Sequence, residues 1–446
     1  MLRVTEELPR HGGSVARDIL KYAPLLVVQG ARQVGKSTLM RQALPPDDTV
    51  FVTLDNPETL LFAKNDPRGF VEQAPQKILA IDEAQRAPEL ALALKASIDE
   101  DRRPGRFAIT GSTDLLKTPE ISDSLAGRAE SLTVYPLSQG EIEKRHEPED
   151  WVEWIIRDCA GGFTPAAETR DNSETITTPQ TAEEMRQIVL AGGYPEPLKR
   201  PDPQANRWFR SYIERLATHD AKELAGASTY PLHLENLLRV LASRGASELV
   251  KAKIARSLGI SETSLGDYLQ LAESMYLINI LPSWGMGFLG RAVRRPKISV
   301  ADCGMASFFS GLTPQKARQS GGFELFGNTL EAFVLAELQK QNTWREEPYR
   351  LFHLRERNTE VDIVIELADG RVILVEVKSA VNVDNRATRH LETLMERLGT
   401  RAVAGTVLYL GEEHLSMNLA AGRIVITPIP TLWRHAKLSA PARKSI

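Results

Sequence analysis

The chain has little cysteine, no long apolar run and no excess of basic charge. Only Cys159 and Cys303 occur among its 446 residues, and they lie far apart in the sequence. This spacing excludes a disulfide framework and a cysteine-rich metal site, and it fits a reducing cytoplasm. No run of about 18 apolar residues occurs, so neither a transmembrane helix nor a membrane partner is expected. The net charge of −3 gives no global signature for nucleic acid, so any such surface must be local.

The most informative stretch that is present follows the apolar run 25–28. It consists of Gly30, Ala31, Arg32, Gln33, Val34, Gly35, Lys36, Ser37 and Thr38. The stretch matches G-x-x-x-x-G-K-[ST] and predicts a loop between a buried strand and a helix. Such a loop presents backbone N–H groups to an anion at the favourable end of a helix dipole. We therefore predict that residues 30–38 bind ATP and Mg²⁺, with Lys36 on the β- and γ-phosphates and Ser37 on the metal.

A second apolar strand, at residues 77–81, ends in Asp82 and Glu83. An acid at the end of a strand beside a phosphate loop can hold Mg²⁺ through water, and Asp82 fits that role. Glu83 fits the general base that polarises the attacking water. Taken alone, the pattern also fits a buried strand whose acidic end merely meets solvent.

Two later positions are candidates for contacts with the transferred phosphate. Ser112 follows the apolar strand 106–111 and could bond the γ-phosphate or the attacking water, with Thr110 as the lesser candidate; Ser112 equally fits an N-cap. Arg128 could stabilise the phosphate in cis or from a neighbouring subunit. A surface or salt-bridged arginine is the alternative for Arg128.

These segments, together with Tyr135-Pro136-Leu137 and residues 191–196, occur in an order that resembles a prokaryotic AAA-type ATPase family. Members of that family carry a C-terminal domain of unknown function (DUF4143-like), and the resemblance spans nearly the whole chain. It implies that Lys36, Ser37, Asp82 and Glu83 carry ATP hydrolysis. It also implies that Ser112 acts as a sensor, and that Arg128 acts as a finger residue across a subunit boundary. The working unit would then be a homo-oligomer such as a hexameric ring.

Composition and periodicity predict an α/β chain of consecutive parts. Residues 1–150 form a P-loop NTPase core with a parallel sheet, and 151–228 form a flexible loop and a helical lid. Residues 229–325 form a winged helix-turn-helix domain, because two helices flank the turn at Gly259 and a strand follows. Residues 326–436 form a small α/β domain, for which a resemblance given below implies a restriction-endonuclease-like fold, and 437–446 form a basic tail.

The predicted winged helix gives mixed signals about DNA. Its second helix exposes acids such as Glu262 and Asp267, which repel phosphate. Basic residues gather where a wing would lie, at Arg291, Arg294, Arg295 and Lys297. That patch fits either a contact with the DNA backbone or a solvated face or subunit contact.

The C-terminal part contains a predicted hairpin at residues 360–378. Strand parity places Asp362 opposite Glu376 only if the loop has an odd number of residues, and residues 368–370 supply three. Asp362 and Glu376 would hold a divalent metal, and Lys378 would orient a nucleophile. The spacing resembles the PD-(D/E)XK nuclease family, in which Glu331 matches an additional acid, although the proline that often precedes the first acid is absent. An active nuclease, a degenerate fold and a plain charged hairpin remain open.

Two functions follow from these observations. The first is an ATP-driven protein that binds, remodels or processes DNA, including branched DNA, with the C-terminal domain gripping or cutting it. The second is a nucleotide-dependent regulatory switch or scaffold that acts on protein partners.

Overall fold

The computed structural model describes residues 7–112, 125–160, 181–221, 231–285, 294–356, 359–383, 385–420 and 422–434. The chain divides into two compact units, each built from separate stretches of sequence. The first contains Met1–Pro148, Gly193–Leu237 and Leu258–Ile278, and the second contains Glu149–Gly192, Leu238–Ser257 and Asn279–Ile446. The chain thus passes between the units several times, whereas the predicted domains follow one another along the sequence. The predicted boundaries remain a prediction.

The first unit begins with an α/β core. Its strands are β1 (Leu25–Gln29), β2 (Thr49–Thr53), β3 (Ile78–Asp82), β4 (Phe107–Gly111) and β5 (Ala129–Thr133). Its helices are α1 (Gly13–Tyr22), α2 (Lys36–Ala43), η1 (Pro46–Asp48), α3 (Pro57–Asn65), α4 (Pro67–Glu72), η2 (Ala84–Arg86), α5 (Leu90–Glu100) and α7 (Gln139–Ile142). Strands β1, β3 and β4 lie within one residue of the predicted apolar runs 25–28, 77–81 and 106–111.

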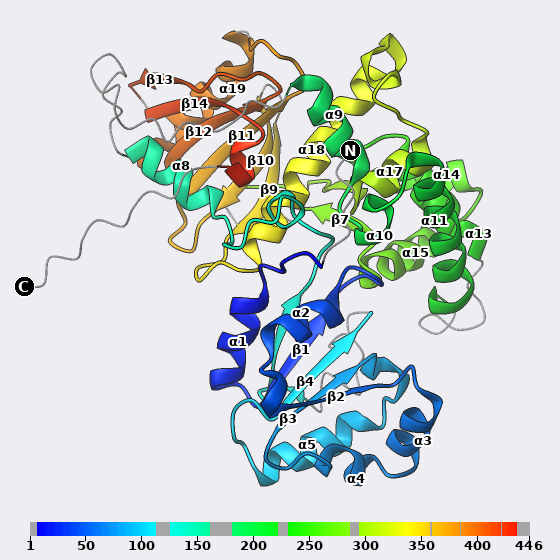
Figure 1. Ribbon diagram of the computed structural model, residues 1–446. Coiled ribbons are helices and arrows are strands. Elements are labelled where there is room, and N and C mark those ends of the chain that lie inside the picture. Colours follow the sequence, from blue (N-terminus) through cyan, green and yellow to red (C-terminus); the bar gives the residue numbers. More distant parts are fainter. Residues whose placement is uncertain are drawn as a thin grey trace, which may run out of the picture. The chain divides into compact units, whose positions relative to one another are not determined.

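The strands form one parallel sheet in the order β2-β3-β4-β1-β5 (Figure 1). Every residue of the interior strand β1 is buried, as expected for a parallel strand covered on both faces. Leu25 and Val27 belong to the apolar core beneath α3, α4 and α5, whereas α1 and α2 contact β1 separately. Because all strands are parallel, their carboxyl ends meet at one edge, and the segments that follow β1, β3 and β4 converge there.

Three further elements of the first unit come from the predicted lid region: α10 (Pro195–Leu198), α11 (Asp202–Arg215) and the π-helical turn η4 (Leu216–Asp220). The remaining predicted lid helix, α9 (Ala182–Ala191), belongs to the second unit. The predicted flexible loop lies almost entirely outside the described residues.

The predicted winged helix divides between the units. It contains α13 (Pro231–Ala242), β6 (Ser247–Glu248), α14 (Lys251–Leu258), α15 (Glu262–Ser274), β7 (Ile278–Leu281) and β8 (Lys297–Val300). The helix, glycine turn, helix and strand occur in the expected order, and Gly259 has a positive φ of 67°. However, α15 belongs to the first unit and most of α14 to the second. A winged-helix fold therefore remains a prediction.

The second unit is built on a six-stranded mixed sheet in the order β13-β14-β12-β11-β10-β9. Its strands are β9 (Arg350–Glu356), β10 (Thr359–Glu366), β11 (Val372–Lys378), β12 (Ala402–Tyr409), β13 (Leu415–Leu419) and β14 (Gly422–Pro428). Its helices include α8 (Trp151–Ala160), α17 (Cys303–Ser310), η5 (Lys316–Arg318), α18 (Ser320–Asn342), α19 (Asn385–Leu398), η6 (Gly399–Arg401) and α20 (Thr431–Arg434). The strands β11, β12 and β14 run parallel, and the others pair antiparallel.

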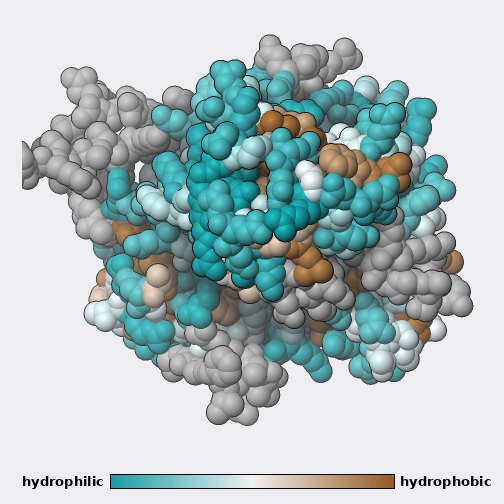
Figure 2. All heavy atoms as spheres, turned by 90° about the horizontal axis from the view of Figure 1, so that it is seen from below, coloured by the Kyte–Doolittle hydropathy of each residue, from teal (hydrophilic) through white to brown (hydrophobic). Residues whose placement is uncertain are grey.

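Two apolar cores cover the two faces of this sheet. Helices α18 and α8 pack with Ile363, Ile365 and Val375, whereas α19 packs with Val364 and Leu374. This alternation is the parity that the sequence predicts for the hairpin. Among the described residues, no helix has the length and apolar character needed to cross a membrane. The face of the molecule in Figure 2 is mostly hydrophilic with separate hydrophobic patches.

Candidate functional site

The phosphate loop occupies the gap between β1 and α2. Gly30 and Gly35 have positive φ angles of 150° and 98°, and Gln33 also has a positive φ of 60°. A Cβ on Gly30 would lie 2.1 Å from the backbone oxygen of Val134, so only glycine fits there. Gly35 is the left-handed residue from which α2 starts. The loop therefore has the backbone of an anion cradle at a helix N-terminus.

Lys36 points into this loop. Its Nζ donates hydrogen bonds to the backbone oxygens of Gly30, at 3.0 Å, and Ala31, at 2.9 Å. The residue is only 5% exposed. Burial lowers the pKa of Lys36 to about 8, although the negative charges of Glu83 and Asp82 oppose the shift. The ammonium thus lies inside the loop, where a phosphate could replace the carbonyl oxygens as its partner.

Asp82 connects the three converging segments. Its carboxylate accepts hydrogen bonds from the Ser37 hydroxyl, at 2.8 and 2.9 Å, and from the Thr110 hydroxyl, at 2.6 Å. Thr110 also accepts a hydrogen bond from the backbone N–H of Glu83, at 3.0 Å, and is fully buried. The lesser candidate from the sequence is therefore the residue that joins β4 to both acids.

Glu83 has a backbone that few non-glycine residues adopt, with φ at 60°. The Gln85 amide donates to the Glu83 carboxylate and, at 3.0 Å, to the Ser112 hydroxyl. Ser112 is therefore linked to Glu83 through Gln85, and its contact with the γ-phosphate or the attacking water remains a prediction. Such left-handed non-glycine residues concentrate at functional sites, where the surrounding contacts hold them.

Arg128 lies at the opposite edge of the sheet. It precedes β5, and Ala129 pairs with Leu25 at the start of β1, whereas Thr133 pairs with Gln29 beside the phosphate loop. Its guanidinium binds both carboxylate oxygens of Asp99, at 2.8 and 2.7 Å. The salt-bridged alternative is therefore present, and a strand length separates Arg128 from its own phosphate loop, so this geometry does not favour a role in cis. A role across a subunit boundary remains a prediction.

The loop and its neighbours fit Mg·ATP. The loop provides backbone N–H groups at a helix N-terminus and an ammonium, and Ser37 with Asp82 supplies a hydroxyl and a carboxylate, the oxygen ligands that Mg²⁺ prefers. Lys36, Ser37 and residues 30–35 could hold the phosphates. Glu83 follows Asp82 directly, and its role as the base that polarises water remains a prediction.

Several contacts of the loop involve residues that the sequence analysis missed. Arg10 donates to the backbone oxygens of Val34 and, at 2.9 Å, Tyr135, and its Nε lies 3.1 Å from Glu141. Arg32 forms an ion pair with Asp220, 188 positions later. Neither local periodicity nor a motif indicates partners this far apart in the chain.

The C-terminal hairpin has the predicted geometry. Glu366 pairs with Val372 and Ile363 with Val375, which sets Asp362 opposite Glu376. Gly370 has a φ of 82°, as a three-residue bulged loop requires. The pairing of β10 with β9 also shifts register between Val361 and Val364, so a bulge lies at Asp362. The predicted loop length and face are confirmed.

The acids of this hairpin have protein partners. Asp362 accepts a hydrogen bond from the Val377 N–H at 2.9 Å, and Glu376 binds Lys378 at 2.6 Å. Burial, and then repulsion from Asp362, raise the pKa of Glu376 to about 8, while Lys378 opposes the shift. One carboxylate oxygen of Glu376 is buried without a hydrogen bond. Asp362, Glu376 and Lys378 thus lie together, but each carboxylate contacts a group of the protein.

Lys297 is a member of this cluster that the sequence analysis placed elsewhere. Its Nζ lies 2.7 Å from Glu331 and 3.5 Å from Asp362. Lys297 is 5% exposed, so it does not belong to a basic wing surface, and that prediction is wrong. Arg294 pairs with Glu356, and Arg291 lies outside the described residues. Burial and the charge of Asp362 raise the pKa of Glu331 to about 8, and Lys297 opposes this.

Among the described residues, no group of three or more His, Cys, Asp or Glu side chains is arranged to hold a metal ion. Metal binding by Asp362, Glu376 and Glu331 therefore remains a prediction, and the ammonium of Lys297 lies beside two of these acids.

Three family matches cover most of the chain. Residues 22–143 match an AAA domain, residues 182–316 match a domain of unknown function (DUF8612), and residues 326–432 match another (DUF4143). An uncharacterized protein of Mycobacterium tuberculosis is 25% identical over 378 residues, which are 83% of this chain and 73% of that protein. One of Methanocaldococcus jannaschii is 22% identical, over 80% of this chain and 76% of that protein.

Solved structures give weaker likenesses. A Walker-type ATPase of Pyrococcus abyssi is 17% identical with a TM-score of 0.41, over 69% of this chain and 99% of that one. AMPPCP-bound DnaA of Aquifex aeolicus is 14% identical with a TM-score of 0.23, over 58% of this chain and 86% of that one. The AAA domain match and the five-stranded parallel sheet together support an AAA-type ATPase core followed by a DUF4143 domain.

Proposed function

We propose that the chain is an ATP-hydrolysing AAA-type protein that acts on DNA as a homo-oligomer. The observation that carries the ATPase half is the convergence of Lys36, Ser37, Asp82 and Glu83 at one edge of the sheet. Lys36 and the loop N–H groups bind the phosphates, and Ser37 with Asp82 positions Mg²⁺. Glu83, held by Gln85, orients the attacking water. Thr110 holds the Asp82 carboxylate and the backbone of Glu83 in place through its two hydrogen bonds.

Phosphate release from Mg·ATP by the purified chain tests this half. Lys36→Ala should abolish turnover while circular dichroism and the melting curve stay those of the wild type. Lys77→Ala is the matched control, because Lys77 is an exposed lysine of the same unit whose Nζ donates a hydrogen bond to the Asp47 backbone oxygen. Turnover retained in the Lys36 variant and equal to that of the Lys77 variant would refute the assignment.

The DNA half rests on the hairpin. Asp362 and Glu376 face each other across β10 and β11, with Lys378 on Glu376, and this arrangement suits binding of a phosphodiester and a divalent metal. DNA binding should weaken as salt rises, because bound phosphates release counterions. Magnesium-dependent cleavage of duplex or branched DNA should disappear in Asp362→Ala and Lys378→Ala.

A second candidate is a nucleotide-dependent regulatory switch that acts on protein partners. The position of Lys297 favours it, because an ammonium 2.7 Å from Glu331 and 3.5 Å from Asp362 competes with a metal for the same carboxylates. The two candidates differ in one measurement: a chain that hydrolyses ATP but binds no duplex, single-stranded or junction DNA at low salt is a switch. ATP turnover stimulated by DNA would exclude the switch.

A further inference from the structure

A helical segment of the first unit makes two contacts with the phosphate loop at the same residue. The Tyr212 hydroxyl, from α11, donates a hydrogen bond to the backbone oxygen of Arg32 at 3.0 Å. The Arg32 guanidinium lies 3.1 Å from both carboxylate oxygens of Asp220, the last residue of η4. One residue inside the loop is therefore held by its backbone and by its side chain from elements about 180 positions later in the sequence.

The ion pair lies close to the phosphate site. The charges of Arg32 and Asp220 both act on Lys36, and those of Glu83 and Asp55 act on Arg32. The side chains of Arg32 and Asp220 are 22% and 11% exposed, so solvent screens their interaction only in part. An anion bound in the loop would meet the Arg32 guanidinium as well as Lys36, and Asp220 would then be a rival for the same cation.

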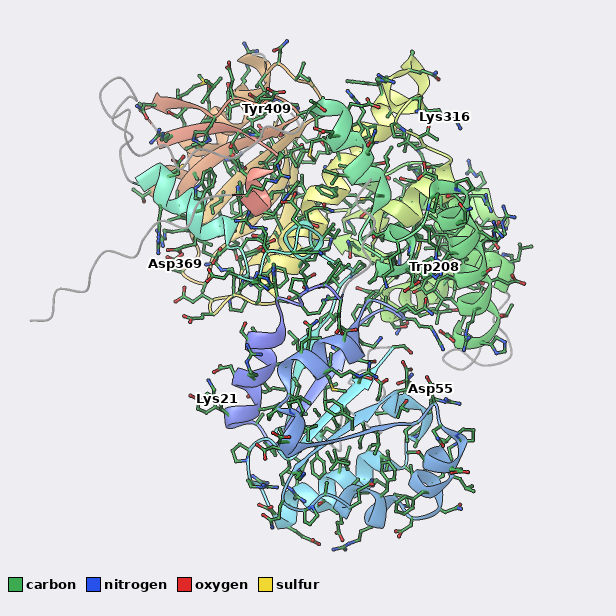
Figure 3. The ribbon with its side chains drawn as sticks, viewed as in Figure 1. Lys21, Asp55, Trp208, Lys316, Asp369 and Tyr409 are labelled. Carbon is green, nitrogen blue, oxygen red and sulfur yellow. The ribbon has the colours of Figure 1, made fainter. Side chains whose placement is uncertain are left out.

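The segment that carries Asp220 has a structure suited to a change of state. The turn Leu216–Asp220 is π-helical, a rare geometry that occurs frequently at functional sites. It continues α11, in which the Trp208 ring stacks on Tyr212 with centroids 4.7 Å apart and planes at 11°. Figure 3 labels Trp208. Tyr194 joins the group through a hydroxyl contact of 3.2 Å with Tyr212. A shift of Arg32 would therefore reach this aromatic group directly.

We propose that Arg32 exchanges Asp220 for the phosphates of a bound nucleotide, and that Asp220 and Tyr212 transmit this exchange to the helical segment 195–220. This inference rests on the proposed ATP binding. In the free loop, Asp220 neutralises Arg32 and ties the loop to η4. When a nucleotide occupies the loop, the guanidinium turns to the phosphates, the tie to Asp220 breaks, and α11 responds through Tyr212. Asp220 is a positioning residue. Its carboxylate lowers the affinity of the loop for nucleotide, and its ion pair with Arg32 couples the loop to the helical segment 195–220.

The sign of one affinity change tests the proposal. Asp220→Asn keeps the shape of the side chain and frees Arg32, so the Kd of a non-hydrolysable ATP analogue, measured by calorimetry, should tighten by about tenfold. If Asp220 only held the loop in shape, the same variant would bind more weakly. A weaker or unchanged Kd therefore overturns the proposal, provided that the wild type binds.

A double-mutant cycle removes a simpler explanation, which is that deleting any nearby negative charge favours an anion. Arg32→Gln should weaken binding, and Asp220→Asn added to it should change the Kd less than twofold, because the cation for which Asp220 and the phosphates compete is gone. If Asp220→Asn tightened the Kd equally in the wild type and in Arg32→Gln, only a general charge effect would remain, and the proposed exchange would be overturned.

Trp208 supplies a readout of the helical segment. It is the one tryptophan within the sequence ranges of the first unit, since the other five are Trp151, Trp154, Trp284, Trp344 and Trp433. Nucleotide should change the fluorescence of the wild type, and Trp208→Phe should remove that change. Tyr212→Phe should bind nucleotide but lose most of the change, because the stack stays while the bond to Arg32 is lost. An undiminished signal in Tyr212→Phe would overturn transmission through Tyr212. Failure of the wild type to bind would instead overturn the proposed function.

Discussion

Thr110 provides the sharpest test of how the ATP site is assembled. Its hydroxyl donates to Asp82 at 2.6 Å and accepts the Glu83 N–H at 3.0 Å, in a fully buried position at the end of β4. Thr110→Val keeps the branched shape of the side chain and removes both bonds. The substitution therefore changes the positions of Asp82 and Glu83 without changing a residue of the phosphate loop.

The magnitude follows from the two bonds. A hydrogen bond to a charged group contributes about 1.5–3 kcal/mol, and a buried N–H without a partner costs about 1–3 kcal/mol. Partial relaxation of Glu83 offsets some of this, so we expect a loss of about 3 kcal/mol in the stability of the first unit. If most of that free energy also holds Glu83 in its catalytic position, turnover falls about 100-fold, since about 1.4 kcal/mol corresponds to tenfold in rate.

Phosphate release under saturating Mg·ATP measures the effect, with the Kd of a non-hydrolysable analogue as the companion. Thr110→Val should lower kcat about 100-fold while the Kd changes far less, and Thr110→Ser, which keeps the hydroxyl, should remain within about threefold of the wild type. Ser112→Ala should have a smaller effect, because Ser112 reaches Glu83 only through Gln85. Turnover of Thr110→Val within twofold of the wild type would refute the reasoning.

Three further perturbations test other parts of the chain. Arg128→Ala should lower turnover at least tenfold with little change in ATP affinity if Arg128 acts on a neighbouring subunit. Asp99→Ala, which breaks the same ion pair, should leave turnover near that of the wild type. Equal losses of turnover in the two variants would indicate a structural role for the ion pair. Lys297→Met should create Mn²⁺-dependent thermal stabilisation that the wild type lacks, because Glu331 and Asp362 lose the ammonium beside them. An unchanged melting temperature with Mn²⁺ would show that these carboxylates become protonated instead. Burial and the charge of Lys297 lower the pKa of His353 from 6.5 to about 4, so stability should fall as the pH drops from 6.5 through 4. About 2 kcal/mol of this loss should be present at pH 5 and absent from His353→Gln in denaturant titrations, and parallel pH profiles would contradict it.

The candidate ATP site and the hairpin were largely predictable because their information is local. The loop 30–38 is a contiguous motif whose glycines have the positive φ angles that the motif requires, and β3 places Asp82 by its length alone. In the hairpin, side-chain alternation and an odd loop were enough to place Asp362 opposite Glu376. Where one strand or one turn sets the position of a side chain, counting residues predicts the face on which it lies, because successive side chains of a strand alternate between the two faces.

Tertiary structure decided which distant groups meet these local sites. The sequence placed Arg128 after a strand, but only the parallel register of β5 with β1 shows that it lies at the far edge of the sheet. It placed Lys297 on a predicted wing, whereas the fold buries that lysine beside Glu331 and Asp362.

Local sequence patterns were therefore sufficient to locate the phosphate loop, the acids at the end of β3 and the face of the hairpin. The structure alone decided the partners of that chemistry: Thr110 between the two acids, Asp220 on Arg32 and Lys297 on Glu331. The physical reason is that a motif or a period constrains residues within a few positions of each other. Contacts between residues far apart depend on how whole elements pack, and many sequences with the same local pattern would pack them differently.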